Sequence, residues 1–490
     1  MQDENKDLAL DVQAATRDTR GRSLSRRDFL KIAGATGAAI SMGAGLGGVL
    51  AGCSGSSSSS TTASTGPIKF GIMGPMGDPS GKNVLRPAEM MFKTINDAGG
   101  VLGRDFEIVG PLDDHNETAQ AITAYESLVS QGCNVILGGS IDDVEAALLS
   151  RIAQQPDILY LSMFASTQAF MVNVKDDYEH YKTYFMYTPT DRGLYFCVQD
   201  PALLLKEKYG WSKVYVFRED MVWTEGIEEF FKTEAPKAGL ENVGISVIPV
   251  DVEDLTPYFR EAEQAGAQII MTFISVFGER LANQAWEAKL PIAMLGHNGI
   301  LNDYGYWERS NGAWGPMATT STWASLEKQT AEWRDFVTQW FTTYSDDPRT
   351  PMWLGESTWM GIKSYKEAVE RAGTFETQAV IKELEKAYYA DAPVAGGFYG
   401  DGEGDLPHTW STPVDKDLVY TENPTRGMGL WESSPYNPMT QWQPPGLAPS
   451  GGYVLPGQPE DYGVLVTVYP PKLAGGDFQA PPFFPDSPNA

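Results

Sequence analysis

The chain has 490 residues, and its 64 Asp and Glu against 37 Lys and Arg give a net charge of −27. A protein this acidic would repel phosphate backbones, so nucleic acid is not an expected partner. The length exceeds what one small core needs, and two lobes are the expected organisation. The acidity is typical of two settings, salty surroundings or an ordinary soluble extracellular protein, and the sequence is compatible with both.

The first 52 residues have the features of an export signal. Ser25–Lys31 (SRRDFLK) contains the paired arginines of a twin-arginine signal, and a Gly- and Ala-rich apolar stretch, Ile32–Leu50, follows. That stretch approaches the length of a transmembrane helix, but its glycines make a poor permanent span. Leu50–Cys53 (LAGC) is typical of a lipobox. We therefore expect Tat export in the folded state and membrane anchoring, at the cell surface or in the periplasm, by a lipid on Cys53.

The segment after Cys53 is rich in serine up to Gly66. Such a composition cannot bury apolar surface, so we expect residues 53–66 to form a flexible linker. A linker of this kind gives an anchored protein the slack to reach a partner.

The folded part is predicted to open with a strand, a loop, a helix and a second strand. The apolar run Ile68–Met73 predicts a buried strand, and Gly74–Gly81 has the composition of a loop. Apolar residues then recur at steps of three and four up to Ile95, which predicts a helix that ends at Gly99. A strand beginning at Phe106 completes a β-loop-α-β unit, which is typical of a parallel sheet covered by helices.

Strands and helices continue to alternate along the chain, which predicts an α/β fold. The further expected elements are, in order, the helix Thr118–Gln131, the strand Asn134–Leu137, the helix Val144–Gln154, the strands Ile158–Leu161 and Lys213–Phe217, the helix Glu225–Ala238, the strand Val243–Val250, the helix Leu255–Ala265, the strand Gln268–Phe273, the helix Glu279–Lys289, the strand Ile292–Leu295, and the helices Thr330–Tyr344, Glu356–Ala372 and Thr374–Ala387.

Three motifs resemble those of a known family. Asn96–Arg104 (NDAGGVLGR) follows a strand and a helix of the right size, Ser162–Ser166 (SMFAS) follows the fourth strand, and Asp254–Phe259 (DLTPYF) precedes another. Together they resemble type I solute-binding proteins of ABC transporters, and among these the branched-chain amino acid (Leu/Ile/Val) binding proteins. The resemblance covers roughly residues 67–405. It implies two doubly wound parallel-sheet lobes, joined by three crossovers, with a ligand held between the lobes.

The resemblance also implies where the lobes begin and end. The crossovers are expected near Met186–Pro189, Met317–Ser321 and Gly397–Asp401. The expected divisions are lobe 1 at 67–187 plus 319–396, lobe 2 at 188–318 plus 397–430, and a Pro/Gly/aromatic-rich C-terminal extension at 431–490. Residues 402–490 depart from the family pattern. Gly463–Tyr469 predicts one more strand there, and the rest suits either an extended surface appendage or partial disorder.

The candidate ligand-binding residues follow predicted strands, because ligands bind at the carboxyl ends of parallel strands. Small residues there let amides and hydroxyls approach a ligand, and aromatic residues provide apolar walls. The resemblance implies that Ser166 holds a ligand carboxylate and that Trp223 covers the ligand; the alternative for Trp223 is ordinary core packing. The candidates are Ser140, Asp142, Phe164, Ala165, Ser166, Trp223, Phe277 and Asn298.

Charges at two of these positions argue against a free α-amino acid. The resemblance implies an acidic residue for the ligand ammonium in a lobe 2 turn, where this chain has the neutral Asn298. In lobe 1, Asp142 and Asp143 would repel a ligand carboxylate, unless they point to solvent as first-turn helix residues. We therefore expect a small polar solute bearing an amine or amide, with an apolar part against Trp223 and Phe277.

Motifs for catalysis are missing from the sequence. GxSxG, HExxH and paired CxxC motifs are absent, and Gly77–Asn83 lacks the first glycine and the Ser/Thr of a phosphate-binding loop. Asp113–His115 suits a solvated strand end better than a metal site. Cys133 and Cys197 are expected to be buried free thiols. We therefore expect no enzyme activity, no cofactor and no metal.

Three functions remain for this sequence. The first is a monomeric substrate-binding lipoprotein of an ABC importer, which delivers a small solute to permease subunits with cytoplasmic ATPases. The second is a ligand sensor of the same fold that signals to a membrane receptor, and neighbouring genes would distinguish the two. The third is a Tat-exported enzyme, which an absorbance spectrum and metal analysis would reveal.

Overall fold

The computed structural model describes residues 66–139, 141–188, 191–298, 301, 305–314, 317–320, 330–345, 353–389, 396–398, 410–411, 439–448, 462–469 and 474–484. The chain divides into two units, 1–65 and 66–490, and all described residues belong to the second. The predicted twin-arginine motif, Cys53 and Ser140 lie outside the described residues. Among the described helices, none is long and apolar enough to cross a membrane.

The first sheet has five strands, all parallel, in the order β2-β1-β3-β4-β5. Its strands are β1 (Ile68–Gly74), β2 (Phe106–Asp113), β3 (Val135–Gly138), β4 (Leu159–Ser162) and β5 (Tyr184–Met186). The helices between and after them are α3 (Pro79–Asp97), α4 (Thr118–Ser130), α5 (Asp142–Ile152), α6 (Gln168–Asp176) and α7 (Tyr178–Tyr181).

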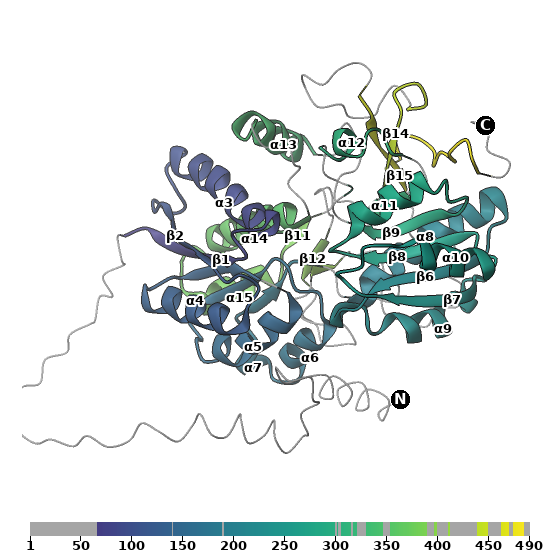
Figure 1. The fold of residues 1–490 in the computed structure, drawn as a ribbon. Helices are drawn as coiled ribbons and strands as arrows, with labels where there is room; N and C mark the ends of the chain where they lie inside the picture. Colours follow the sequence, from purple (N-terminus) through teal and green to yellow (C-terminus); the bar gives the residue numbers. More distant parts are fainter. Residues whose placement is uncertain are drawn as a thin grey trace, which may run out of the picture. The chain divides into compact units, whose positions relative to one another are not determined.

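Both faces of this sheet are buried, which explains why its strands are apolar throughout. In β1, Phe70 belongs to the core cluster formed with α3, and Met73 to the cluster formed with α4 and α5. Figure 1 shows α3 and α4 on opposite sides of β1. Helix α3 begins at Pro79, inside the segment Gly74–Gly81 that we predict as a loop, because the Asp78 side chain accepts a hydrogen bond from the Ser80 amide at 2.8 Å and Pro79 occupies the first turn.

The second sheet has seven strands in the order β15-β14-β10-β9-β8-β6-β7. Five of them are parallel, namely β6 (Lys213–Glu219), β7 (Glu241–Ile248), β8 (Ile269–Ile274), β9 (Ala293–Asn298) and β10 (Met317–Thr320). Side chains of α8 (Asp191–Tyr209) and α9 (Ile227–Lys237) belong to one core cluster against this sheet, and those of α10 (Thr256–Gln264) and α11 (Gly278–Glu287) to another. The short elements η2 (Val222–Thr224) and α12 (Tyr306–Arg309) lie in its loops. The predicted α/β class with parallel sheets is confirmed.

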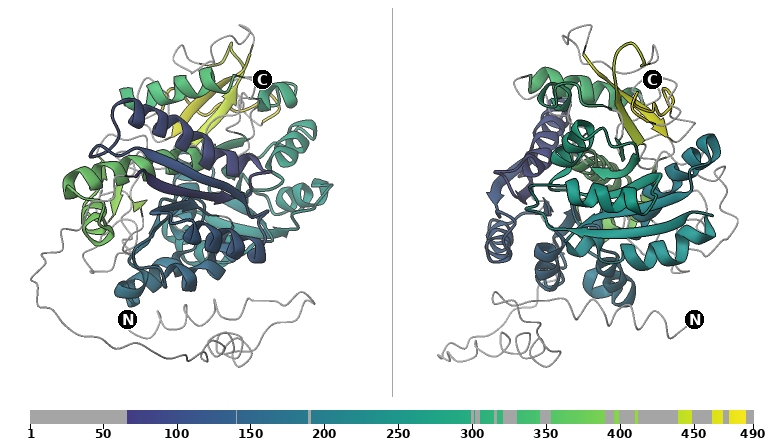
Figure 2. Two further views of the ribbon diagram at one scale, coloured as in Figure 1. Left: turned by 90° about the vertical axis from the view of Figure 1, so that its left-hand side faces the viewer. Right: turned by 45° about the vertical axis from the view of Figure 1, so that its right-hand side comes forward.

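The last two strands add an antiparallel edge to the second sheet. Strand β14 (Met439–Gln443) pairs with β10, and β15 (Val464–Tyr469) pairs with β14; Figure 2 shows this hairpin in yellow. The strand predicted at Gly463–Tyr469 is therefore confirmed. The Gln441 side chain also exchanges two hydrogen bonds, each 2.8 Å long, with the backbone of Gln479. Part of the region that we predict as a separate extension thus completes the second sheet.

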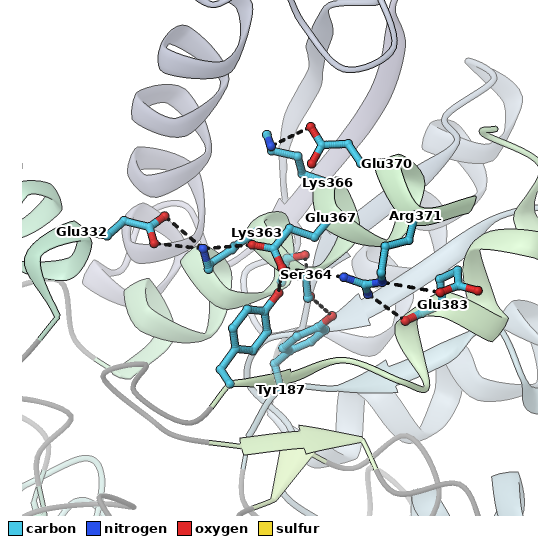
Figure 3. Close-up of polar contacts among 11 residues, drawn as sticks. Tyr187, Glu332, Lys363, Ser364, Lys366, Glu367, Glu370, Arg371 and Glu383 are labelled. Atoms are coloured by element: carbon cyan, nitrogen blue, oxygen red, sulfur yellow. Dashed lines mark hydrogen bonds and ion pairs between the residues drawn. The ribbon is translucent and has the colours of Figure 1, made fainter. Parts of the chain in front are cut away.

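Helix α14 contacts the chain before and after the five parallel strands of the second sheet. Its Ser364 shares a 2.6 Å hydrogen bond with the Tyr187 hydroxyl just after β5 (Figure 3). Its Glu367 accepts a hydrogen bond of 2.6 Å from the Tyr389 hydroxyl. Lys363 pairs with both Glu332 and Glu367 (Figure 3). The elements of this region are α13 (Ala331–Thr343), α14 (Trp353–Ala372), α15 (Thr377–Leu384), β11 (Tyr388–Tyr389), β12 (Gly396–Phe398) and β13 (Trp410–Ser411).

Two of the three predicted crossovers lie where the chain passes between the two large sheets, whereas the third, Gly397–Asp401, begins in β12 of a small three-stranded sheet (β11-β12-β13) and continues outside the described residues. The chain leaves the first sheet after β5 and enters α8, and it leaves β10 before α13, whose Trp333 and Trp340 lie in the core of the first sheet. Cys133 is a buried free thiol, as predicted, whereas the side chain of Cys197 lies outside the described residues.

Candidate functional site

The strand orders locate one switch point in each sheet. Strand β1 lies between β2 and β3, and β6 lies between β7 and β8, so consecutive connections diverge at these central strands. In open α/β sheets, ligands bind outside the carboxyl ends of the strands at such points. The candidate site therefore comprises the turns after β1, β3 and β4 in the first sheet and after β6, β8 and β9 in the second. Helix α5, which begins after β3, contacts η2, which follows β6.

In the first sheet, Asp142 joins the turns that follow β3 and β4. It is the first residue of α5, and its Oδ1 accepts hydrogen bonds from the amides of Ser166 and Thr167 at 3.0 and 2.9 Å. Desolvation raises the pKa of Asp142 above its ordinary value, while the bonds from Thr167 and Ser166 oppose this shift. We expect the Asp142 side chain either at the ligand or in solvent. In the structure it is hydrogen-bonded to two backbone amides of the chain.

A second carboxylate holds the turn after β1. Oδ1 of Asp113, the last residue of β2, accepts a 3.0 Å bond from the Met76 amide and a 2.9 Å bond from the His115 amide. Among the described residues, no group of three or more His, Cys, Asp and Glu side chains could hold a metal ion.

In the second sheet, Glu219 at the end of β6 has a similar role. Its Oε2 accepts bonds from the amides of Ser275 (2.9 Å) and Val276 (3.1 Å) in the turn after β8. Its Oε1 accepts bonds from the Ser275 hydroxyl and, at 2.8 Å, from the indole nitrogen of Trp223. Glu219 is fully buried, so this carboxylate ties together the two turns at the switch point.

Glu145 is a buried acid beneath the turn after β3. It has no exposed surface; its Oε1 accepts a 2.7 Å bond from the Tyr184 hydroxyl, and its Oε2 has no hydrogen-bond partner. Burial raises the pKa of Glu145 to about 8, and the nearby Asp142 and Asp114 add to the shift. Glu145 is therefore largely protonated at neutral pH, which lowers the cost of its burial.

The predicted aromatic residues of the second sheet are mostly buried. Trp223 is 9% exposed, its backbone carbonyl accepts a 2.7 Å bond from the Tyr195 hydroxyl, and its ring lies edge-on to His297 with the centroids 5.5 Å apart. Phe277 is 3% exposed and packs in the core beside α10 and α11. Burial lowers the pKa of His297 to about 4, so this imidazole is neutral at neutral pH.

The remaining predicted residues differ in what they can offer a ligand. Asn298 is 1% exposed, and its side-chain amide donates a 2.9 Å bond to the Gly278 carbonyl at the start of α11. Ala165 is fully buried, and its carbonyl accepts a hydrogen bond from Thr188. Phe164 and Ser166 are half-buried, with Phe164 packed against the core of the first sheet.

The structure thus brings the predicted residues together in two groups. Asp142 and Ser166 are hydrogen-bonded in the first sheet, whereas Glu219 connects Trp223 to the turn that contains Phe277 in the second. Sequence reasoning missed Glu219 and Glu145. The available signal for Glu219 was an acidic residue two positions after the predicted strand Lys213–Phe217 and four positions before the candidate Trp223.

Comparisons with known proteins agree with this architecture. The family model described as periplasmic binding protein matches residues 67–411, and the model of the twin-arginine translocation signal matches residues 23–43, which confirms the predicted Tat signal. A curated relative, Leu/Ile/Val-binding protein homolog 3 of Brucella melitensis, is 24% identical over 249 residues. That match covers 49% of this chain and 63% of the relative, less than two thirds of the relative's length.

Solved structures share the fold at low sequence identity. An ABC transporter substrate-binding protein from Sphaerobacter thermophilus has a TM-score of 0.61 at 17% identity, with 84% of this chain and 99% of that one covered. A solute-binding protein of an ABC transporter from R. palustris, in complex with benzoate, has a TM-score of 0.59 at 14% identity, with 86% and 99% covered. The family model spans most of the described fold, and the chain belongs to the periplasmic binding protein family.

Proposed function

We propose that this chain is the substrate-binding lipoprotein of an ABC importer. It captures a small solute at the strand ends of its two sheets and delivers it to permease subunits with cytoplasmic ATPases. The transport energy comes from those ATPases, and the chain itself contributes binding without catalysis. Family membership supports this role, as does the Tat signal that directs the folded protein out of the cytoplasm.

One observation carries the proposal: both sheets have a switch point, and in each the turns at that point are held by hydrogen bonds to a carboxylate. Asp142 and Asp113 position turns of the first sheet, and Glu219 positions turns of the second. Binding sites need preorganised turns, because a turn that must be ordered on binding costs affinity. Helix α5 contacts η2, so the Asp142 and Trp223 segments belong to one candidate site.

The solute class follows from the same residues. Asn298 supplies no charge for an ammonium group and is engaged with Gly278, and Asp142 brings negative charge to the first sheet. We therefore keep the hypothesis of an amino acid-like amide or amine. Trp223 is 9% exposed and Phe277 3% exposed, so Trp223 is the better placed of the two aromatic residues to give the solute an apolar contact.

A thermal-shift screen of the exported protein against small metabolites, followed by calorimetry, tests the solute-binding role. We expect a small polar solute to bind and to raise the melting temperature, because a ligand that binds only the folded state stabilises it. As a control, the Trp223→Ala variant should bind that solute at least about tenfold more weakly. A complete metabolite panel without any binder would contradict the role.

The lipid anchor is a separate part of the proposal. Cys53 is the last residue of the lipobox and precedes a serine-rich linker, so Cys53→Ser should release the protein from membranes. The affinity for the solute should not change, since the linker precedes the folded unit. Membrane fractionation together with calorimetry checks both statements, and a Cys53→Ser protein that stays in the membrane fraction would contradict the anchor.

A further inference from the structure

The turn after β4 contains a pair of amides that suits an anion. Ser166 and Thr167 immediately precede α6, a nine-residue helix with Thr167 at its N-cap. Adjacent amides at a helix start carry partial positive charge and commonly bind anions. Here the anion comes from the chain itself, because Oδ1 of Asp142 lies 3.0 and 2.9 Å from the two nitrogens. A ligand carboxylate would have to displace it.

Glu145 provides an independent observation at the same strand ends. Its Oε2 is fully buried without a hydrogen-bond partner and lies against the turn after β3: a Cβ on Gly139 would come within 2.9 Å of it. The Tyr160 hydroxyl nearby is likewise buried without a partner. This end of the first sheet therefore contains buried polar groups that can still form hydrogen bonds, close to the carboxylate of Asp142.

The second sheet repeats the arrangement with a different residue. Glu219 accepts hydrogen bonds from the amides of Ser275 and Val276. In both sheets, therefore, a carboxylate of the chain accepts hydrogen bonds from two adjacent amides that follow a strand. These amides are therefore satisfied before any solute arrives. A bound carboxylate would gain nothing from them and would meet a like charge.

Building on the solute-binding function above, we propose that Asp142 determines the charge selectivity of the site. Its carboxylate excludes solutes that present a carboxylate to the first sheet and favours those that present an amine or a primary amide. Specificity of this kind arises from a repulsive element built against the wrong ligand as much as from contacts with the right one. Asp142 acts as a positioning and specificity-determining residue, since it also holds the turn that contains Ser166.

The first test uses probes that differ only in the acid group. Leucine with leucinamide, and benzoate with benzamide, are titrated by calorimetry into the wild-type chain and into the Asp142→Ala and Asp143→Ala variants. Asp143 is the matched control, because it is an exposed acid one residue away in the same helix turn. The wild-type chain should favour the amide of each pair, and Asp142→Ala should shift the acid-to-amide affinity ratio toward the acid by about tenfold. Asp143→Ala should leave the ratio near the wild-type value.

A wild-type preference for the acids, or equal shifts in the two variants, would overturn the proposal. If Asp142→Ala does not fold, Asp142→Asn replaces it, since an amide oxygen can keep both backbone bonds while the charge is removed. Asp142→Asn should then raise the relative affinity for the acids, and an unchanged ratio would count against the proposal.

A second test needs no knowledge of the solute. Acetate is titrated into protein labelled with 15N-threonine, and the Thr167 amide resonance is followed by NMR. In Asp142→Ala the resonance should shift with acetate and saturate, whereas in the wild type and in Asp143→Ala it should not move. A silent Thr167 amide in Asp142→Ala would overturn the proposal. A metabolite panel without a binder, combined with acetate binding to Asp142→Ala, would instead contradict the solute-binding function alone.

Discussion

The strand ends of the two sheets use the same chemistry with different geometry. In the second sheet, the fully buried Glu219 spans the switch point, because it belongs to β6 and binds the turn after β8. In the first sheet, Asp113 ties the turn after β1 to the end of β2, and Asp142 ties the starts of α5 and α6. The hydrogen bonds of Asp113 lie on the β2 side of the switch point between β1 and β3, and those of Asp142 lie on the β4 side. Neither carboxylate connects turns across the switch point. The second sheet therefore presents two turns as one rigid surface, and the first presents separately held turns.

This difference assigns distinct tasks to the two sheets. A carboxylate that is buried and bonded to two amides, a hydroxyl and an indole is hard to displace. Asp142 keeps partial exposure, so its charge can act on a solute. We therefore regard the second sheet as the fixed wall of the site and the first sheet as the part that discriminates between solutes.

Among single substitutions compared at neutral pH, the largest expected loss of stability comes from removing Glu219. Glu219→Ala leaves the Trp223 indole and the amides of Ser275 and Val276 without their acceptor. An unsatisfied buried donor costs about 1–3 kcal/mol; the indole bond is buried and the two amide bonds are part-buried, so the free energy of unfolding should fall by about 2–4 kcal/mol. Urea unfolding measures the change. Asp220→Ala is the control, because Asp220 is exposed and should alter stability by less than about 0.5 kcal/mol. Equal effects of the two substitutions would remove the basis of the fixed wall.

Glu145 gives the first sheet a dependence on pH. Its pKa is about 8 in the folded chain against an ordinary value of 4.5, so between these values the folded state holds a proton that the unfolded state has released. The contribution of Glu145 to stability therefore falls as pH rises from 4.5 to 8, by up to about 1.4 kcal/mol per pH unit. Glu145→Gln should lack this component. Unfolding free energies of both proteins between pH 5 and 8.5 test this, and parallel pH profiles would show that Glu145 is not protonated.

The smallest expected effect concerns one hydrogen bond of the fixed wall. Trp223→Phe keeps an aromatic ring but loses the 2.8 Å bond from the indole to Glu219. Chemical unfolding should register a loss of about 1–2 kcal/mol. Trp286→Phe serves as the comparison, since Trp286 contributes ring contacts with Trp314 and Phe483 and lies away from this carboxylate. A loss for Trp223→Phe as large as that for Glu219→Ala would mean that ring packing, rather than the carboxylate, holds the turn.

Much of the fold could be predicted because hydrophobic patterns and helix caps are local. The strands at Ile68–Met73 and Gly463–Tyr469 both follow from neighbouring residues, whereas the cap at Asp78 lies in a segment that we predict as a loop. Helix α8 was missed, because Pro201 lies inside it and interrupts the usual helical pattern. The pairing of β14 with β10 joins segments over 100 residues apart, which no local pattern encodes.

The candidate site was predictable in position but less so in chemistry. The end of a strand can be predicted from the residue at which an apolar run ends. Asp142, Ser166 and Trp223 were candidate ligand-binding residues because they follow such ends. The acceptors of side-chain hydrogen bonds depend on tertiary packing, so the sequence did not reveal that Asp142 bonds to the Ser166 amide or that Asn298 bonds to Gly278. Buried acids such as Glu145 were missed for the same reason, since an acidic residue in a helix is usually exposed.

A crystal structure of the protein with the solute identified by screening tests the central claim most directly. We predict that the solute contacts the turns after β1 and β3 and those after β6 and β8. It should present an amine or amide to Asp142, which keeps its bonds to Ser166 and Thr167. A solute bound away from these turns, or a solute carboxylate seated on the Ser166 and Thr167 amides with Asp142 displaced, would contradict the account.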